Sequence, residues 1–95
     1  MFRSAQNSGF QMVFQNGYTI SVQYGPLNYC EKRSSDYFEP IKPAEGGMLR
    51  WESKDAEIAI WSSDKVWYEF EDGQEVKGWC SPDEVAEWIS KVSKW

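Results

Sequence analysis

The sequence predicts an α+β domain, in which an antiparallel sheet of about five strands carries one packed helix. Residues 10–24 and 55–79 alternate apolar with polar side chains around turn sequences, as antiparallel hairpins do. Residues 82–94 carry apolar side chains at helical spacing behind a helix-start sequence. The chain has 95 residues, enough for one hydrophobic core, so we expect a single domain spanning 1–95.

The register of the first hairpin, residues 10–24, follows from its two apolar rows. A two-residue Asn-Gly turn would place these rows on opposite faces of the ribbon. A three-residue loop, residues 15–17, with Gly17 in the left-handed region, pairs Phe14 with Tyr18 and brings both rows to one face. We therefore expect the three-residue loop.

Residues 55–79 show the same pattern with two turns. A three-residue loop at 63–65 would pair Ile60 with Tyr68. A second three-residue loop at 71–73 would then reverse the chain into a third strand. This stretch therefore predicts a three-stranded meander.

Residues 25–54, between the hairpin and the meander, lose this periodicity. They hold three of the four prolines and the pair Gly46-Gly47, which interrupt regular structure. We expect an irregular connection, and connections of this length in a small domain are often functional.

The C-terminal stretch has a complete helix-start signal. Ser81 is the expected N-cap, Pro82 the first helical residue, and Glu84 the partner of the cap in a capping box. One apolar stripe follows and consists of Val85, Trp88, Ile89, Val92 and Trp95. We expect this helix to lie across a face of the sheet.

Composition excludes several function classes. Histidine is absent, which removes His-based triads and ordinary zinc sites, and no glycine-rich phosphate loop occurs. Cys30 and Cys80 lack metal-binding spacing, and reduced thiols are favoured over a disulfide. We therefore expect no catalytic residue, no metal and no cofactor.

Acidic and basic residues are unevenly distributed along the chain. Residues 55–87 hold ten acidic residues against two lysines, a local charge of −8, whereas residues 1–54 carry about +1. A chain with so little basic surface argues against nucleic-acid binding and favours a basic protein partner. No apolar run resembles a membrane span or a signal peptide, so we expect a cytoplasmic protein.

The predicted meander gathers one candidate binding surface on its polar face. Its register sets Trp61 opposite Trp67 and Glu69 opposite Glu75, and it also sets Glu57 opposite Glu71. Three interpretations stay open: a solvated face, a contact patch for a basic partner with tryptophan anchors, and a carboxylate pair in acid–base or metal chemistry.

A second candidate surface follows the first hairpin. Side chains that bind phosphate or stack on a base gather there, namely Asn28, Tyr29, Lys32, Arg33 and Tyr37. Their positions on a loop beside a sheet edge suit a small nucleotide. Loop structure alone explains the same residues equally well.

Several stretches together resemble small hypothetical proteins of tailed bacteriophages. They are Gly17–Gly25, Asn28–Cys30, Ala56–Trp61, Val76–Trp79 and Ser81–Glu84. This resemblance implies an accessory protein that antagonises bacterial immunity, either by masking a host defence protein or by sequestering a signalling nucleotide in the host cytoplasm.

These observations favour a non-catalytic binding protein, and they leave room for a homo-oligomer. Two alternatives come from other classes. One is a small carboxylate- or metal-dependent hydrolase of nucleotides, and the other is a structural component of the virion.

Overall fold

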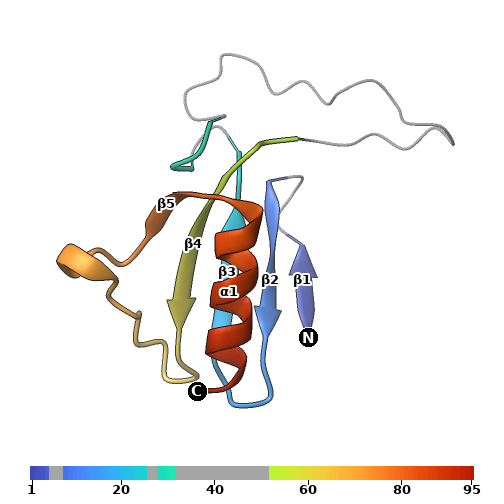
Figure 1. Cartoon of the computed structure of the whole chain (residues 1–95). Helices are drawn as coiled ribbons and strands as arrows, with labels where there is room; N and C mark the ends of the chain where they lie inside the picture. Colours follow the sequence, from blue (N-terminus) through green and yellow to red (C-terminus); the bar gives the residue numbers. More distant parts are fainter. Residues whose placement is uncertain (5–7, 26–27, 32–51) are drawn as a thin grey trace, which may run out of the picture.

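A computed structural model of the protein describes residues 1–4, 8–25, 28–31 and 52–95. These residues form one antiparallel sheet and one α-helix (Figure 1). The strands are β1 (Phe2–Ser4), β2 (Gly9–Val13), β3 (Thr19–Gln23), β4 (Ala56–Trp61) and β5 (Lys77–Cys80), and the helix is α1 (Pro82–Ser93). The strands lie side by side in the order β1-β2-β3-β4-β5. The expected α+β fold class is confirmed.

The hairpin of β2 and β3 has the expected register. Met12 pairs with Ile20, and the backbone N–H of Phe14 donates to the carbonyl of Tyr18 at 2.8 Å. Gly17 has a φ of 91°, a conformation that glycine adopts without steric cost. Both apolar rows therefore face the same side of the sheet.

Strand β1 was not expected from the sequence. It pairs with β2 at the edge of the sheet, and all three of its residues are exposed. The terminal ammonium of Met1 also donates to the carbonyl of Val13 at 3.0 Å. Three exposed residues are too few to show a strand period, which explains why the pattern missed this strand.

The region between β4 and β5 differs from the expected meander. The first loop is as expected, since the N–H of Ser62 donates to the carbonyl of Val66 at 2.9 Å. Beyond a single bridge between Trp61 and Trp67, however, residues 66–70 form no ladder with β4. β5 takes the place beside β4 instead.

The aromatic side chains of residues 66–70 pack toward α1. The rings of Phe70 and Trp88 meet edge to face with centroids 5.0 Å apart, and Tyr68 lies 5.0 Å from Trp95. Phe70 is buried, with 8% of its surface exposed. Burial of such rings outweighs a few ladder hydrogen bonds, so the chain leaves the sheet to reach the helix.

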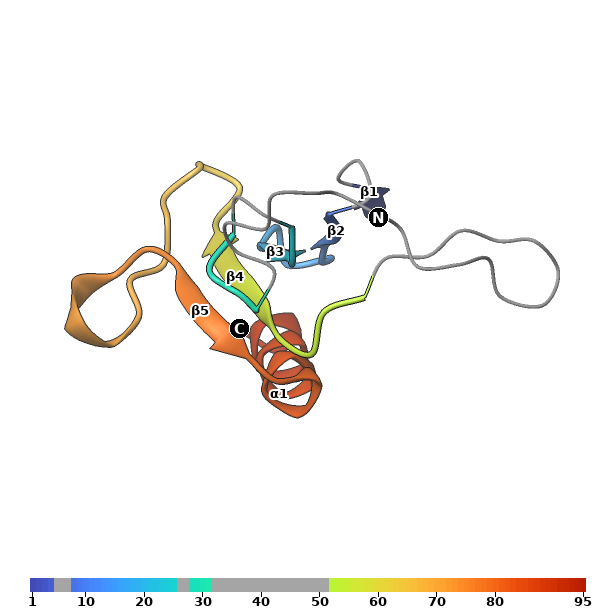
Figure 2. The ribbon, with the colours of Figure 1, turned by 90° about the horizontal axis from the view of Figure 1, so that it is seen from above.

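Helix α1 begins as expected and covers one face of the sheet (Figure 2). The Ser81 hydroxyl accepts from the N–H of Glu84, and the Glu84 carboxylate accepts from the N–H of Ser81, both at 3.2 Å. The residues at the centre of the core are Ile20, Val22, Ile58, Ile60, Val85 and Val92. We call the opposite side of the sheet the helix-free face.

The far end of α1 is fastened to the first hairpin. The side-chain amide of Asn16 donates to the carbonyl of Val92 at 2.8 Å, while its oxygen accepts from the N–H of Tyr18 at 3.0 Å. The Val92 carbonyl also accepts from the N–H of Trp95 at 3.2 Å, so Asn16 adds a second donor at the last turn of the helix. This loop residue thus acts as a helix cap at long range.

Candidate binding site

A bulge in β5 gives Trp79 an unusual backbone conformation, whose positive φ is shared by only one other non-glycine residue of the described ranges, Lys65. Ala56 pairs with Cys80 and Ile58 with Lys77, so Glu57 of β4 faces two residues of β5, Gly78 and Trp79. Trp79 has a φ of 51°, in the left-handed region. For a residue other than glycine this conformation costs roughly 1–2 kcal/mol. Such strain persists where the surrounding structure holds it, often at functional sites.

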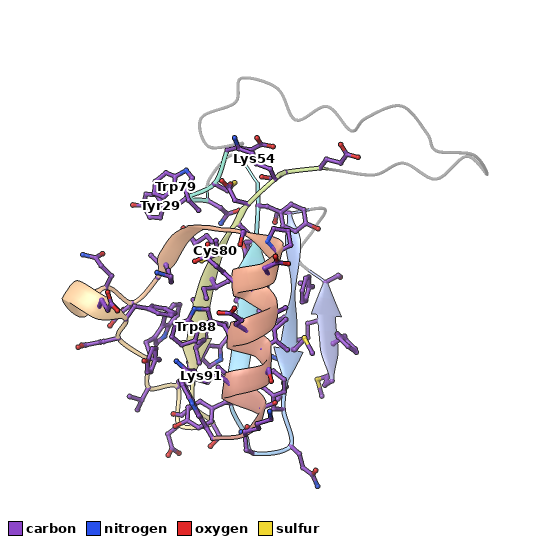
Figure 3. All side chains as sticks on the ribbon, in the orientation of Figure 1. Tyr29, Lys54, Trp79, Cys80, Trp88 and Lys91 are labelled. Carbon is purple, nitrogen blue, oxygen red and sulfur yellow. The ribbon has the colours of Figure 1, made fainter. Side chains whose placement is uncertain are left out.

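The bulge sets Trp79 beside Tyr29, and we call these two residues the aromatic corner (Figure 3). The N–H of Trp79 donates to the carbonyl of Tyr29 at 2.8 Å, and the ring centroids lie 5.7 Å apart at an angle of 44°. Both rings face solvent, with Trp79 57% exposed and Tyr29 39% exposed. Two aromatic side chains are therefore held side by side with part of their surface exposed to solvent.

The carboxylate of Glu57 lies at the base of the aromatic corner. It accepts from the N–H of Tyr29 at 2.9 Å and from the side-chain amide of Asn28 at 3.5 Å. Within the described part of the chain, no lysine or arginine forms an ion pair with Glu57. The expected pairing of Glu57 with Glu71 is wrong, because Gln23 of β3 and the bulge of β5 occupy its two sides.

A reciprocal pair of hydrogen bonds joins Glu31 to the two residues before β4, Lys54 and Asp55. The N–H of Glu31 donates to the Asp55 carboxylate at 2.7 Å, and the N–H of Lys54 donates to the Glu31 carboxylate at 2.8 Å. We call this contact the carboxylate clasp. It fixes the acidic side chains of Glu31 and Asp55 at the same end of the sheet as the aromatic corner.

A second aromatic pair stands further along β4. Trp61 and Trp67 have ring centroids 5.0 Å apart at 34°, and Trp67 is 42% exposed. Because Ile60 faces the core, the alternation of β4 places Trp61 on the helix-free face with Glu57. Four strand residues span about 13 Å, so Trp61 stands about that far from Glu57 on the same face.

The structure brings together some of the predicted site residues. Asn28 and Tyr29 join through Glu57, and Trp61 contacts Trp67 as expected. Glu69 and Glu75 are exposed on the segment between β4 and β5. Lys32, Arg33 and Tyr37 lie outside the described residues.

Sequence reasoning did not place Trp79 and Glu57 in one site with Tyr29. A signal existed, because an isolated glycine within a strand pattern, here Gly78, indicates a bulge or a close approach of another backbone. Gly78 makes both. The contact itself joins residues 29 and 79, which no local pattern reveals.

Among the described residues, no three His, Cys, Asp or Glu side chains gather as a metal ion would require. The same residues include no helix with the length and apolar character needed to cross a membrane. Comparison of the chain with known protein families, curated proteins and solved structures finds no significant match.

Proposed function

We propose that this protein is a non-catalytic binding protein that contacts a basic protein partner through its helix-free face. The observation that carries the proposal is Trp79, whose ring is held outward in a strained backbone conformation. Tryptophan and tyrosine dominate the binding energy of many protein interfaces. Exposure of 57% at Trp79 leaves that energy available to a partner.

The chemistry of the aromatic corner favours a lysine or arginine side chain of the partner. A cation is attracted to the face of a tryptophan or tyrosine ring, by about 0.5–2 kcal/mol. The Glu57 carboxylate at the base of the corner adds negative charge beside the rings. Complementary charge around an aromatic anchor raises both the rate and the specificity of association.

This face fits an inhibitor that covers a surface of another protein. In the context that the phage resemblance implies, the partner is a bacterial defence protein in the host cytoplasm. In the alternative mechanism, sequestration of a signalling nucleotide, Lys32 and Arg33 would supply the positive charge that binds the phosphate. At the aromatic corner, the Glu57 carboxylate would repel a phosphate, so we favour masking of a protein.

Affinity capture from bacterial lysate, read by quantitative mass spectrometry, tests the proposal. We expect Trp79→Ala and Glu57→Gln to lower recovery of a basic protein at least tenfold relative to wild type. Phe2→Ala is the control, because Phe2 is 76% exposed on the edge strand β1. Equal recovery by wild type and Trp79→Ala would contradict the proposal. A nucleotide co-purifying in stoichiometric amount would instead support sequestration.

A further inference from the structure

A pocket of about 280 Å³ opens on the other face of the sheet, beside the first turns of α1. Its lining includes Phe10 and Tyr24 from the first hairpin, Ala86 and Ile89 from α1, and Cys80 from β5. Lys54 and Asp55 stand in its lining as the charged residues. The pocket is separate from the aromatic corner, because its walls lie on the side of the sheet that α1 covers.

The size and lining of the pocket suit a single aromatic ring with a short chain. A cavity of about 150 Å³ holds benzene, so 280 Å³ leaves room for a few further atoms. Phe10 and Ile89 are only half-buried, so each has apolar surface that a ligand can cover. The carboxylate clasp holds the backbone N–H of Lys54 and the side-chain carboxylate of Asp55, so the charged side of the pocket is pre-formed.

The charges around the pocket favour a positive ligand group. The pKa of the Cys80 thiol is raised to about 11, first by burial and then by the negative charge of Glu84, with Asp55 acting in the same direction and Lys77 against it. The carboxylates of Glu84 and Asp55 thus add negative charge beside Cys80, and the ammonium of Lys77 opposes them. At the charged side, Asp55 is half-buried while Lys54 is exposed, and water screens an exposed charge more strongly.

We propose that this pocket binds a small arylalkylamine, with the aromatic ring between Phe10 and Ile89 and the ammonium group at Asp55. Asp55 keeps one carboxylate oxygen on the N–H of Glu31 and offers the other to the ligand. The site is independent of the aromatic corner, and Trp79→Ala should leave it intact.

Two matched probes test the proposal by NMR titration of the ¹⁵N-labelled protein. Phenethylamine and 3-phenylpropionate share a ring and a short chain but carry opposite charges. We expect phenethylamine to shift the amide signals of Ala86 and Ile89 and to bind at least tenfold more tightly than the acid. Absence of shifts with the amine, or equal affinity for the two probes, would overturn the proposal.

Two substitutions locate the binding. Asp55→Asn keeps the oxygen that accepts from Glu31 and removes the charge, so the preference for the amine should disappear. Ala86→Leu fills the pocket and should abolish the shifts, whereas Ser90→Leu adds the same side chain at an exposed position outside the lining. Unchanged amine binding in both Asp55→Asn and Ala86→Leu would place the ligand elsewhere and reject this site.

Discussion

Gly78 crosses Tyr29 so closely that no side chain fits between them. A Cβ atom at position 78 would lie 2.6 Å from the Cβ of Tyr29 and 3.0 Å from its carbonyl oxygen. The same carbonyl accepts the hydrogen bond from Trp79. The position of the aromatic corner thus depends on the absence of a Cβ atom at position 78.

Gly78→Ala should displace the loop at Tyr29 and break the hydrogen bond from Trp79. We expect a loss of about 1–3 kcal/mol in the free energy of unfolding, measured by urea denaturation. In a Tyr29→Gly background the nearest clashing atom is gone, so the same substitution should cost clearly less. Equal costs in the two backgrounds would show that the crowding at Tyr29 is not the cause.

At position 79, glycine should give a more stable protein than alanine. Both substitutions remove the ring, but only alanine retains the left-handed strain recorded at Trp79. Trp79→Gly should therefore be more stable than Trp79→Ala by about 1 kcal/mol, the reverse of the order in an ordinary strand. Thermal melts of the two variants decide the matter, and alanine proving the more stable would mean that the backbone is not strained.

Substitution of Asn16 separates its role in the loop from its role at the helix. Asn16→Ala should cost about 1 kcal/mol through the lost hydrogen bonds. Asn16→Asp can still accept from Tyr18 but sets a negative charge against the carbonyl of Val92, at the negative end of the helix dipole. We expect aspartate to cost at least as much as alanine near neutral pH and to recover stability when acid protonates it. A nearly harmless Asn16→Asp would show that only the loop matters.

Stability should fall in alkaline solution because of Cys80. The thiol proton is lost near the ordinary pKa of 9.0 in the unfolded chain but only at about 11 in the folded protein. Between these values the unfolded state binds fewer protons, so the free energy of unfolding decreases as pH rises, and below pH 9 the contribution is fully present. We expect the free energy of unfolding, measured by denaturation at a series of pH values across this range, to decrease less with pH for Cys80→Ala than for wild type. Parallel curves would contradict the assignment.

Two tryptophans should differ sharply in their effect on stability. Trp88 packs on Phe70 and carries the ammonium of Lys91 4.5 Å from its ring centroid, so Trp88→Ala should cost about 3–5 kcal/mol. Trp67 is exposed and contacts Trp61, so Trp67→Ala should cost only about 1 kcal/mol. Calorimetry of both variants provides the comparison. Similar melting temperatures would mean that the ring cluster at α1 contributes little.

Local patterns predicted the parts of the fold that local chemistry determines. The register of β2 and β3 followed from apolar alternation, since a slip of one residue would have exposed every apolar side chain. The start of α1 followed from Ser81, Pro82 and Glu84, which bond within one helical turn. These features need no knowledge of distant residues.

Contacts between distant residues escaped prediction. The bulge at Trp79 exists because Tyr29 approaches the same backbone, and residues 66–70 leave the ladder because Trp88 and Trp95 draw their rings toward α1. In each case the conformation depends on whether strand pairing or packing against a distant residue is lower in energy. A single stretch of sequence does not contain that information. The aromatic corner is a product of such a contact, which is why its residues were predicted only in part.

The bond between Asn16 and Val92 also bears on how the protein is made. A ribosome releases the first hairpin well before it releases Val92, so the bond from the Asn16 side-chain amide can form only after helix α1 has been synthesised. Docking of the helix end on the hairpin is therefore expected to follow formation of the hairpin turn.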